Sequence, residues 1–173
     1  GKEGAFITKA TAQLMRDFGA MLSPQSAFIL NLGLESLHVR MARHCENGQA
    51  VAEYLQNHPK IAWVRYSGLP GDPYYAVAQK YLPKGSCGVV SFGVKGGRQA
   101  AETFMGRLRL GAIATHVADA RTCCLHPASS THRQMNDAEL AAAGVSADLV
   151  RLSVGLESKE DLIADLEQAL SAV

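Results

Sequence analysis

The residue with the clearest chemical potential in this chain is Arg151, the one charged residue of an apolar run at positions 149–154. The alternation of that run predicts a buried strand with Arg151 on one of its faces. A guanidinium in such a place costs free energy unless an anion meets it, and arginine can hold a carboxylate through two parallel hydrogen bonds. Two interpretations are therefore open. Arg151 anchors a carboxylate ligand, or it forms a structural ion pair with an acidic neighbour such as Asp119 or Glu157.

Histidines and cysteines gather in the same third of the sequence, at His116, Cys123, Cys124, His126 and His132. These residue types bind zinc, but their spacing contains no CxxC pair, so the sequence predicts no metal site. Cys123 and Cys124 are adjacent and would point to opposite faces of a strand, where they pack as small apolar residues. Cys–His nucleophilic catalysis would need a cysteine with a lowered pKa, and no feature of the sequence indicates one.

A polar loop at positions 129–133 follows, and it contains Thr131 and His132. Loops carry function more often than the elements they join, so this segment is a candidate active-site loop. The glycines at 93–97 match neither a GxGxxG nor a P-loop pattern and are interpreted as a strand end and turn.

Composition narrows the class of protein. The chain has 173 residues, enough for one domain with a sizeable core or one domain plus part of another, and a net charge of +1. The balanced charge argues against a nucleic-acid partner, and no apolar run approaches the roughly 18 residues needed to span a membrane. Four cysteines without framework spacing predict reduced thiols in a cytoplasmic protein. The chain begins with Gly1 rather than methionine, which we interpret as a cut end.

Elements that would position these residues follow from periodicity and caps. The expected helices span about 5–18, 24–33, 34–57, 74–81, 98–108, 137–143 and 159 onward, and the expected strands about 61–66, 88–94, 110–117, 121–126 and 149–154. Gly48 lies inside a predicted helix and indicates a close packing point. Helices first, then short strands interleaved with helices, predict an α/β architecture with a small sheet covered by helices.

Several runs resemble a known family. They include Leu22-Ser23-Pro24, Gly33 to Leu37, His44 with Asn47, Asp119 to Thr122, His126 to Ser129, Thr131-His132 and Arg151 to Glu157. The chain is similar, in order and over its whole length, to the pyridoxal-phosphate enzymes of cysteine and methionine metabolism. Within that family it looks most like the O-acetylhomoserine sulfhydrylase branch.

The resemblance implies a fold-type-I enzyme whose small domain has a mostly antiparallel sheet. Residues 1–33 would end the large cofactor-binding domain, and residues 34–173 would form the small domain with its connecting long helix. The implied reaction joins O-acetyl-L-homoserine and sulfide to give L-homocysteine and acetate, with pyridoxal 5'-phosphate as the cofactor. Arg151 would grip the substrate carboxylate. His116, where many relatives have Ser or Asn, would lie beside it as a hydrogen-bonding group or proton carrier.

One departure limits the resemblance. The family's cofactor-binding lysine follows a Ser-x-Thr pattern and precedes Gly-His, whereas Lys9 follows Thr8 and precedes a helical segment, so we reject Lys9 for that role. We expect the chain alone to be inactive and to associate with its own N-terminal half, or as a homodimer or tetramer. A cystathionine or methionine γ-lyase or γ-synthase of the same family is the alternative. A non-catalytic module for carboxylate binding or assembly is a second.

Overall fold

The computed structural model describes residues 2–173; Gly1, where the predicted large-domain segment 1–33 begins, lies outside the described residues. The chain divides into two compact units, Gly1–His38 and Val39–Val173. Among the described residues, no helix is both long and apolar enough to cross a membrane.

The first unit is helical, as predicted for positions 5–18 and 24–33. Its elements are η1 (Lys2–Gly4), α1 (Ala5–Thr8), the π-helix η2 (Lys9–Met15), α2 (Arg16–Phe18) and α3 (Pro24–Glu35), followed by the start of α4 (Leu37–Gln56). Gly19 ends the first helical stretch with φ 62°, the left-handed conformation that glycine adopts without strain. Ser23 caps α3 by accepting a hydrogen bond from the Ser26 N–H at 3.1 Å. None of the side chains described in α1, η2, α2 and α3 is buried.

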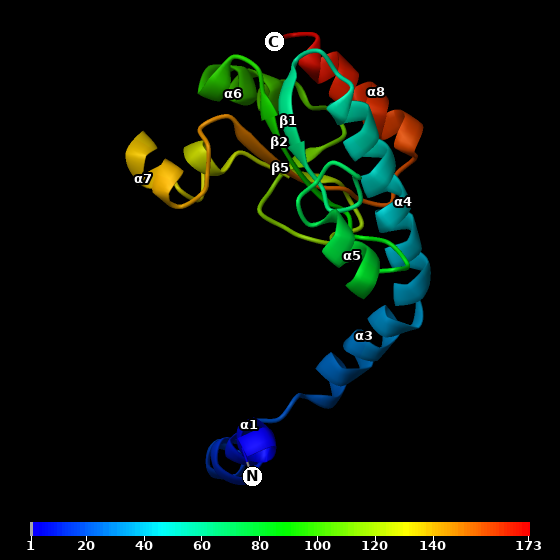
Figure 1. Ribbon diagram of the computed structural model, residues 1–173. Helices are drawn as coiled ribbons and strands as arrows, with labels where there is room; N and C mark the ends of the chain where they lie inside the picture. Colours follow the sequence, from blue (N-terminus) through cyan, green and yellow to red (C-terminus); the bar gives the residue numbers. More distant parts are fainter. Residues whose placement is uncertain (1) are drawn as a thin grey trace. The chain divides into compact units, whose positions relative to one another are not determined.

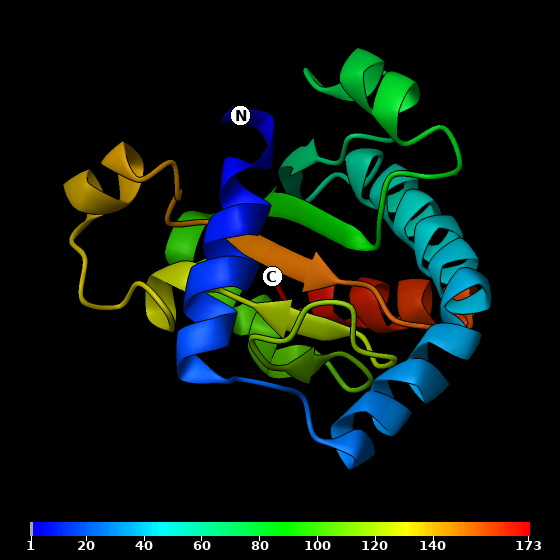
Figure 2. The ribbon, with the colours of Figure 1, turned by 90° about the horizontal axis from the view of Figure 1, so that it is seen from below.

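The second unit is built on a sheet of five strands (Figure 1). The strands are β1 (Ile61–Arg65), β2 (Val89–Val94), β3 (Ala112–Ile113), β4 (Cys123–Leu125) and β5 (Leu149–Ser153), in the spatial order β1-β2-β5-β4-β3. Only β3 and β4 pair in parallel, so the predicted mostly antiparallel sheet is confirmed. The central strands β2, β5 and β4 lie side by side in Figure 2.

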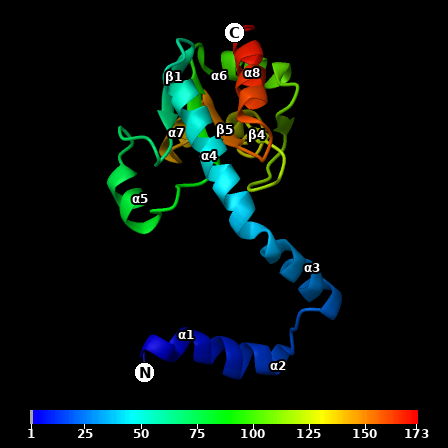
Figure 3. The same ribbon diagram turned by 90° about the vertical axis from the view of Figure 1, so that its right-hand side faces the viewer.

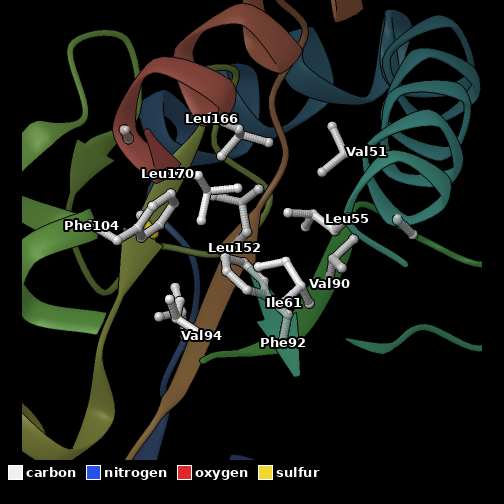
Figure 4. Close-up of a cluster of buried hydrophobic side chains, with 14 of the residues drawn as sticks. Val51, Leu55, Ile61, Val90, Phe92, Val94, Phe104, Leu152, Leu166 and Leu170 are labelled. Carbon is white, nitrogen blue, oxygen red and sulfur yellow. The ribbon is translucent and has the colours of Figure 1, made fainter. Parts of the chain in front are cut away.

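Helices α4, α6 (Gly97–Arg107) and α8 (Lys159–Leu170) cover one face of this sheet. Alternate residues of β2 and β5 face those helices, because successive side chains of a strand point to opposite faces. Figure 4 shows the resulting apolar core, which includes Val51, Leu55, Val90, Phe92, Phe104, Leu152, Leu166 and Leu170. Phe92 and Phe104 meet edge to face, with ring centroids 5.7 Å apart.

Helices α4 and α8 also contact each other at the protein surface (Figure 3). Glu167 of α8 accepts a hydrogen bond from the Tyr54 hydroxyl and lies 3.5 Å from the His58 ring nitrogen. Gly48 of α4 is the close packing point that the sequence predicts, because a Cβ there would lie 2.6 Å from the Cys87 carbonyl oxygen.

Two shorter helices complete the second unit: α5 (Tyr75–Tyr81) and α7 (Asp137–Ala142), with the 3-10 helix η3 (Pro127–Ser129) beside β5. A capping box between Asn136 and Glu139 starts α7.

The predicted strands at 110–117 and 121–126 are much shorter in the structure, where only Ala112–Ile113 and Cys123–Leu125 pair. A buried carboxylate in α8 accounts for the late start of the first of these strands. Asp165 accepts hydrogen bonds from the backbone N–H groups of Arg109, Leu110 and Gly111, each at 2.9 Å, so these donors serve the carboxylate and not a strand ladder. Burial alone would raise the pKa of the Asp165 carboxyl, but the three donors outweigh it and the pKa lies below its usual value.

Candidate functional site

Arg151 lies in β5, the middle strand of the sheet, and its side chain points away from the apolar core. Val150 and Leu152 are fully or almost fully buried against the helices, so Arg151 between them projects from the other face. In the strand register it stands between Ser91 of β2 and Leu125 of β4. A central strand fixes its backbone on both sides, which gives this guanidinium a rigid base.

Among the described residues, the hydrogen bonds of the Arg151 side chain go to backbone carbonyls. Its Nη2 donates to the Thr115 carbonyl at 2.9 Å and approaches the His116 carbonyl at 3.4 Å. Its Nε is buried and has no hydrogen-bond partner. Within residues 2–173 no carboxylate forms an ion pair with Arg151. A buried donor without a partner is rare and calls for a ligand or a water.

The two acidic residues that could have paired with Arg151 are engaged elsewhere. Glu157 accepts from the Thr122 backbone N–H at 2.7 Å and from its hydroxyl at 2.9 Å. Asp119 accepts from the backbone N–H of Arg121 at 3.0 Å and lies 3.5 Å from the Arg121 Nε. The backbone donor first and then the Arg121 side chain lower the pKa of the Asp119 carboxyl to about 2. The structural ion pair is therefore absent among the described residues.

A tight turn follows His116 and is hydrogen-bonded to β5, the strand that contains Arg151. Ala118 has φ 59°, a left-handed conformation that costs conformational free energy for any residue that has a Cβ. The Ala118 N–H donates to the Ser153 hydroxyl at 2.9 Å, which ties the turn to β5. The His116 side chain is 60% exposed, and its Nδ1 lies 3.3 Å from an Asp119 oxygen. The imidazole of His116 is thus exposed, while its backbone carbonyl lies 3.4 Å from the Arg151 Nη2.

The chain that leaves β5 is held by polar residues of α4, whose positions in the fold the sequence does not reveal. The Asn47 amide donates to the carbonyls of Gly155 at 2.9 Å and Glu157 at 2.8 Å, and the His44 Nδ1 meets the Val154 carbonyl at 2.7 Å. A Cβ at Gly155 would lie 2.5 Å from the Thr122 nitrogen, so only glycine fits there. These contacts fix where β5 ends and so where Arg151 sits.

The other predicted residues, His126, Thr131 and His132, form no hydrogen bond to Arg151 among the described residues. His126 is buried, with Nδ1 2.7 Å from the Ser129 hydroxyl and Nε2 2.9 Å from the Ala147 carbonyl, so both ring nitrogens are occupied. Thr131 and His132 contact each other at 2.9 Å, and among the described residues neither is hydrogen-bonded to Arg151. The backbone carbonyl of His116 thus lies next to Arg151, whereas the Thr131–His132 pair forms no hydrogen bond to Arg151 among the described residues.

The cysteines carry no activated thiolate at these positions. Cys124 faces the core and its sulfur lies 3.2 Å from that of Met105, whereas Cys123 faces the side of Arg151. Burial raises the pKa of the thiols of Cys45, Cys123 and Cys124. A nucleophilic cysteine needs the opposite shift.

A cavity of about 970 Å³ opens beside Arg151 on the same sheet face, lined among others by Trp63, Arg65, Ser91 and Leu149. Arg151 is not among its lining residues. Arg65 pairs with Ser91, which pairs with Arg151, so the two arginines stand two strands apart in one cross-strand row. The candidate site is therefore identified by Arg151, whose Nε has no hydrogen-bond partner among the described residues, and not by the cavity volume.

The second unit is thus a small sheet covered by helices, and its central strand carries Arg151, which forms no ion pair with a carboxylate among the described residues. Residues 2–171 match the model of the Cys/Met metabolism PLP-dependent enzyme family. The chain belongs to this family, whose members depend on pyridoxal phosphate, and the predicted resemblance is confirmed.

Individual relatives agree with this assignment. The chain is 47% identical over 169 residues to O-acetyl-L-homoserine sulfhydrylase 1 of Thermus thermophilus, covering 98% of this chain and 40% of that protein. It is 44% identical over 155 residues to L-methionine gamma-lyase of Pseudomonas deceptionensis, covering 90% and 39%. The chain thus spans about two fifths of the length of the curated relatives it matches.

A solved structure has the same fold. It is a Campylobacter jejuni protein described as an O-acetylhomoserine (thiol)-lyase with N'-pyridoxyl-lysine-5'-monophosphate. The TM-score is 0.86 at 38% identity, covering 96% of this chain and 40% of that one.

Proposed function

We propose that the chain is the C-terminal, substrate-binding part of an O-acetyl-L-homoserine sulfhydrylase, which converts O-acetyl-L-homoserine and sulfide to L-homocysteine and acetate. The observation that carries the proposal is Arg151, held on a central strand with no carboxylate partner within residues 2–173. The name of the Thermus relative supports the choice of substrate.

Each residue of the site has a distinct proposed role. Arg151 spends one nitrogen on the Thr115 carbonyl, which leaves Nε and Nη1 for the two oxygens of an amino-acid carboxylate. His116 at the rim would hydrogen-bond the substrate or carry a proton to and from it. Thr131 and His132 would belong to a second loop of the site, which would move toward the substrate when it binds.

The cofactor supplies the electron sink that makes the elimination and replacement possible. The unpartnered Arg151 Nε fits the carboxylate of an amino-acid substrate that pyridoxal phosphate would hold. None of the described residues is assigned to the cofactor itself, and Lys9 lies in the π-helix η2 without the flanking motif of the cofactor-binding lysine. We therefore propose that the chain alone is inactive.

We further propose that residues 1–33 belong to the large cofactor-binding domain and residues 34–173 to the small domain. The helices of the first unit would pack against the rest of the enzyme or a partner subunit of a homodimer or homotetramer. Phe6, Phe18 and Phe28 are 83%, 80% and 67% exposed, which supports such a contact. Free cysteines throughout the described chain support a cytoplasmic location. Sedimentation of the chain as a well-behaved monomer would contradict the proposed association.

The decisive experiment is a product assay on the full-length protein with pyridoxal phosphate. Homocysteine formation from O-acetyl-L-homoserine and sulfide is expected. Arg151→Lys keeps the charge but loses the fork that matches a carboxylate, and should lower kcat/KM about 100-fold, equivalent to about 2.7 kcal/mol. Arg65→Lys is the matched control, because it lies in the same cross-strand row and should leave kcat/KM unchanged.

The same assay separates the alternatives. Release of α-ketobutyrate and ammonia from methionine or cystathionine, without homocysteine synthesis, would favour the γ-lyase that the Pseudomonas relative suggests. Binding of amino acids without turnover in the full-length, cofactor-loaded protein would favour a non-catalytic module.

A further inference from the structure

Three potential metal ligands converge beside Arg151, although they are far from forming a motif in the sequence. One ligand atom each from His116, Asp119 and Cys123 lies within 4.8 Å of the other two. His116 and Asp119 come from the turn after β3, and Cys123 is the first residue of β4. Imidazole, carboxylate and thiolate are the ligand types that zinc prefers.

The spacing of these atoms suits a tetrahedral centre. Two ligand atoms that each lie about 2.0–2.1 Å from a tetrahedral zinc are about 3.3 Å apart, and the His116 Nδ1 lies 3.3 Å from the Asp119 Oδ2. A thiolate at about 2.3 Å from the metal would lie about 3.6 Å from each of them. The Cys123 sulfur lies within 4.8 Å of both atoms, so each of these two distances has to shorten by no more than about 1.2 Å. Its contact to the Arg121 carbonyl is a weak one at 3.6 Å.

The turn is held ready for this role. Arg121 donates its backbone N–H to the Asp119 Oδ1 at 3.0 Å and its Nε lies 3.5 Å from the same oxygen, which orients the carboxylate and leaves Oδ2 facing His116. Partners of this kind orient metal ligands in many sites. Arg151 holds the carbonyls of Thr115 and His116 on the other side.

We propose that His116, Asp119 and Cys123 bind a divalent cation of the Zn²⁺ class through one nitrogen, one oxygen and one sulfur, with the fourth position open. Binding replaces the His–Asp hydrogen bond with two metal–ligand bonds: Nδ1 of His116 gives up its proton, and the neutral imidazole carries its one proton on Nε2, which stays available to hydrogen-bond the substrate. The thiol of Cys123 releases its proton to solvent as the Zn–S bond forms. The two anionic ligands balance the +2 charge of the ion. The nearby guanidinium groups of Arg121 and Arg151 then favour water or an anion as the fourth ligand.

The sulfur ligand makes the proposal testable without any activity assay. Co²⁺ added to the 173-residue chain should give a thiolate-to-cobalt charge-transfer band in the near ultraviolet, and Zn²⁺ should bleach it. Cys123→Ser should abolish the band, with its far-ultraviolet circular dichroism checked against the parent. Cys87→Ser is the matched control and should keep the band.

A second variant guards against misfolding. His116 is exposed, so His116→Ala leaves the core intact, and it should weaken Co²⁺ binding by at least about tenfold, since even outer partners of a metal site contribute that much. Absence of a charge-transfer band in the parent chain would overturn the proposal. So would its persistence in Cys123→Ser, or its loss in Cys87→Ser.

Discussion

Replacing Arg151 by methionine distinguishes a ligand anchor from a structural residue, because the two roles predict different losses in the free energy of unfolding. A buried arginine that pairs with a buried carboxylate loses about 3–5 kcal/mol when one partner is removed, since the other charge is left uncompensated. In this chain no such carboxylate is present within residues 2–173, and the Nε of Arg151 is buried without a partner. The penalty of an orphaned charge therefore does not arise.

The expected magnitude follows from the contacts that the change removes and relieves. Loss of the charge-assisted hydrogen bond to the Thr115 carbonyl costs about 1.5–3 kcal/mol. Removal of the unpaired Nε–H returns about 1–3 kcal/mol of desolvation penalty. The free energy of unfolding of Arg151→Met should consequently lie within about 2 kcal/mol of the parent value.

Urea unfolding of the 173-residue chain, followed by far-ultraviolet circular dichroism, measures this difference. Asp165→Ala serves as the reference for a structural residue, because it leaves three backbone N–H groups without their hydrogen-bond acceptor. This variant should lower the free energy of unfolding by about 3 kcal/mol. A loss of 3 kcal/mol or more in Arg151→Met, comparable to the reference, would refute the reasoning and make Arg151 a structural residue. In the full-length enzyme the same variant should lose kcat/KM at least as severely as Arg151→Lys.

Three further predictions concern the scaffold of the site. Gly48→Ala should destabilise the chain, against the usual helix preference, because the new Cβ would lie 2.6 Å from the Cys87 carbonyl oxygen; Gly106→Ala, with open space around it, should instead stabilise by about 0.5–1 kcal/mol, and thermal unfolding compares the two. Ala118→Gly should raise the free energy of unfolding by about 0.5–1 kcal/mol, since glycine adopts φ 59° without the cost of a Cβ; an unchanged melting temperature would argue against strain at this turn. Asp165→Asn should lower the free energy of unfolding by about 2 kcal/mol at neutral pH. Because the pKa of Asp165 is lowered in the folded protein, its stabilisation is complete above the usual carboxyl pKa of about 4 and is lost as the pH falls through the folded pKa. The difference in stability between the two proteins should therefore shrink at acid pH, which urea titrations at several pH values measure.

The features that the sequence alone determined are those that depend on near neighbours. The alternation around Arg151 placed it in a strand because side-chain direction repeats every two residues. The predicted helix starts at about 24 and 159 also hold in the structure, where the side chains of Ser23 and Ser158 each accept a hydrogen bond from a backbone N–H three residues away. The family was evident from runs of residues, since motifs survive as short segments. The predicted close contact at Gly48 also followed from its position within a helix.

Only the tertiary structure decided what those residues meet. Whether Arg151 has a carboxylate partner depends on what Glu157, close by in the chain, and Asp119, much earlier in it, contact in the fold, and both accept hydrogen bonds from other donors. The start of β3 was decided by Asp165, whose carboxylate reaches backbone groups 54 to 56 residues earlier in the chain. The meeting of His116 with Cys123 was likewise invisible in their spacing. Long-range hydrogen bonds and charge pairs have no local signature, because a polar side chain has many possible partners and the fold selects one of them.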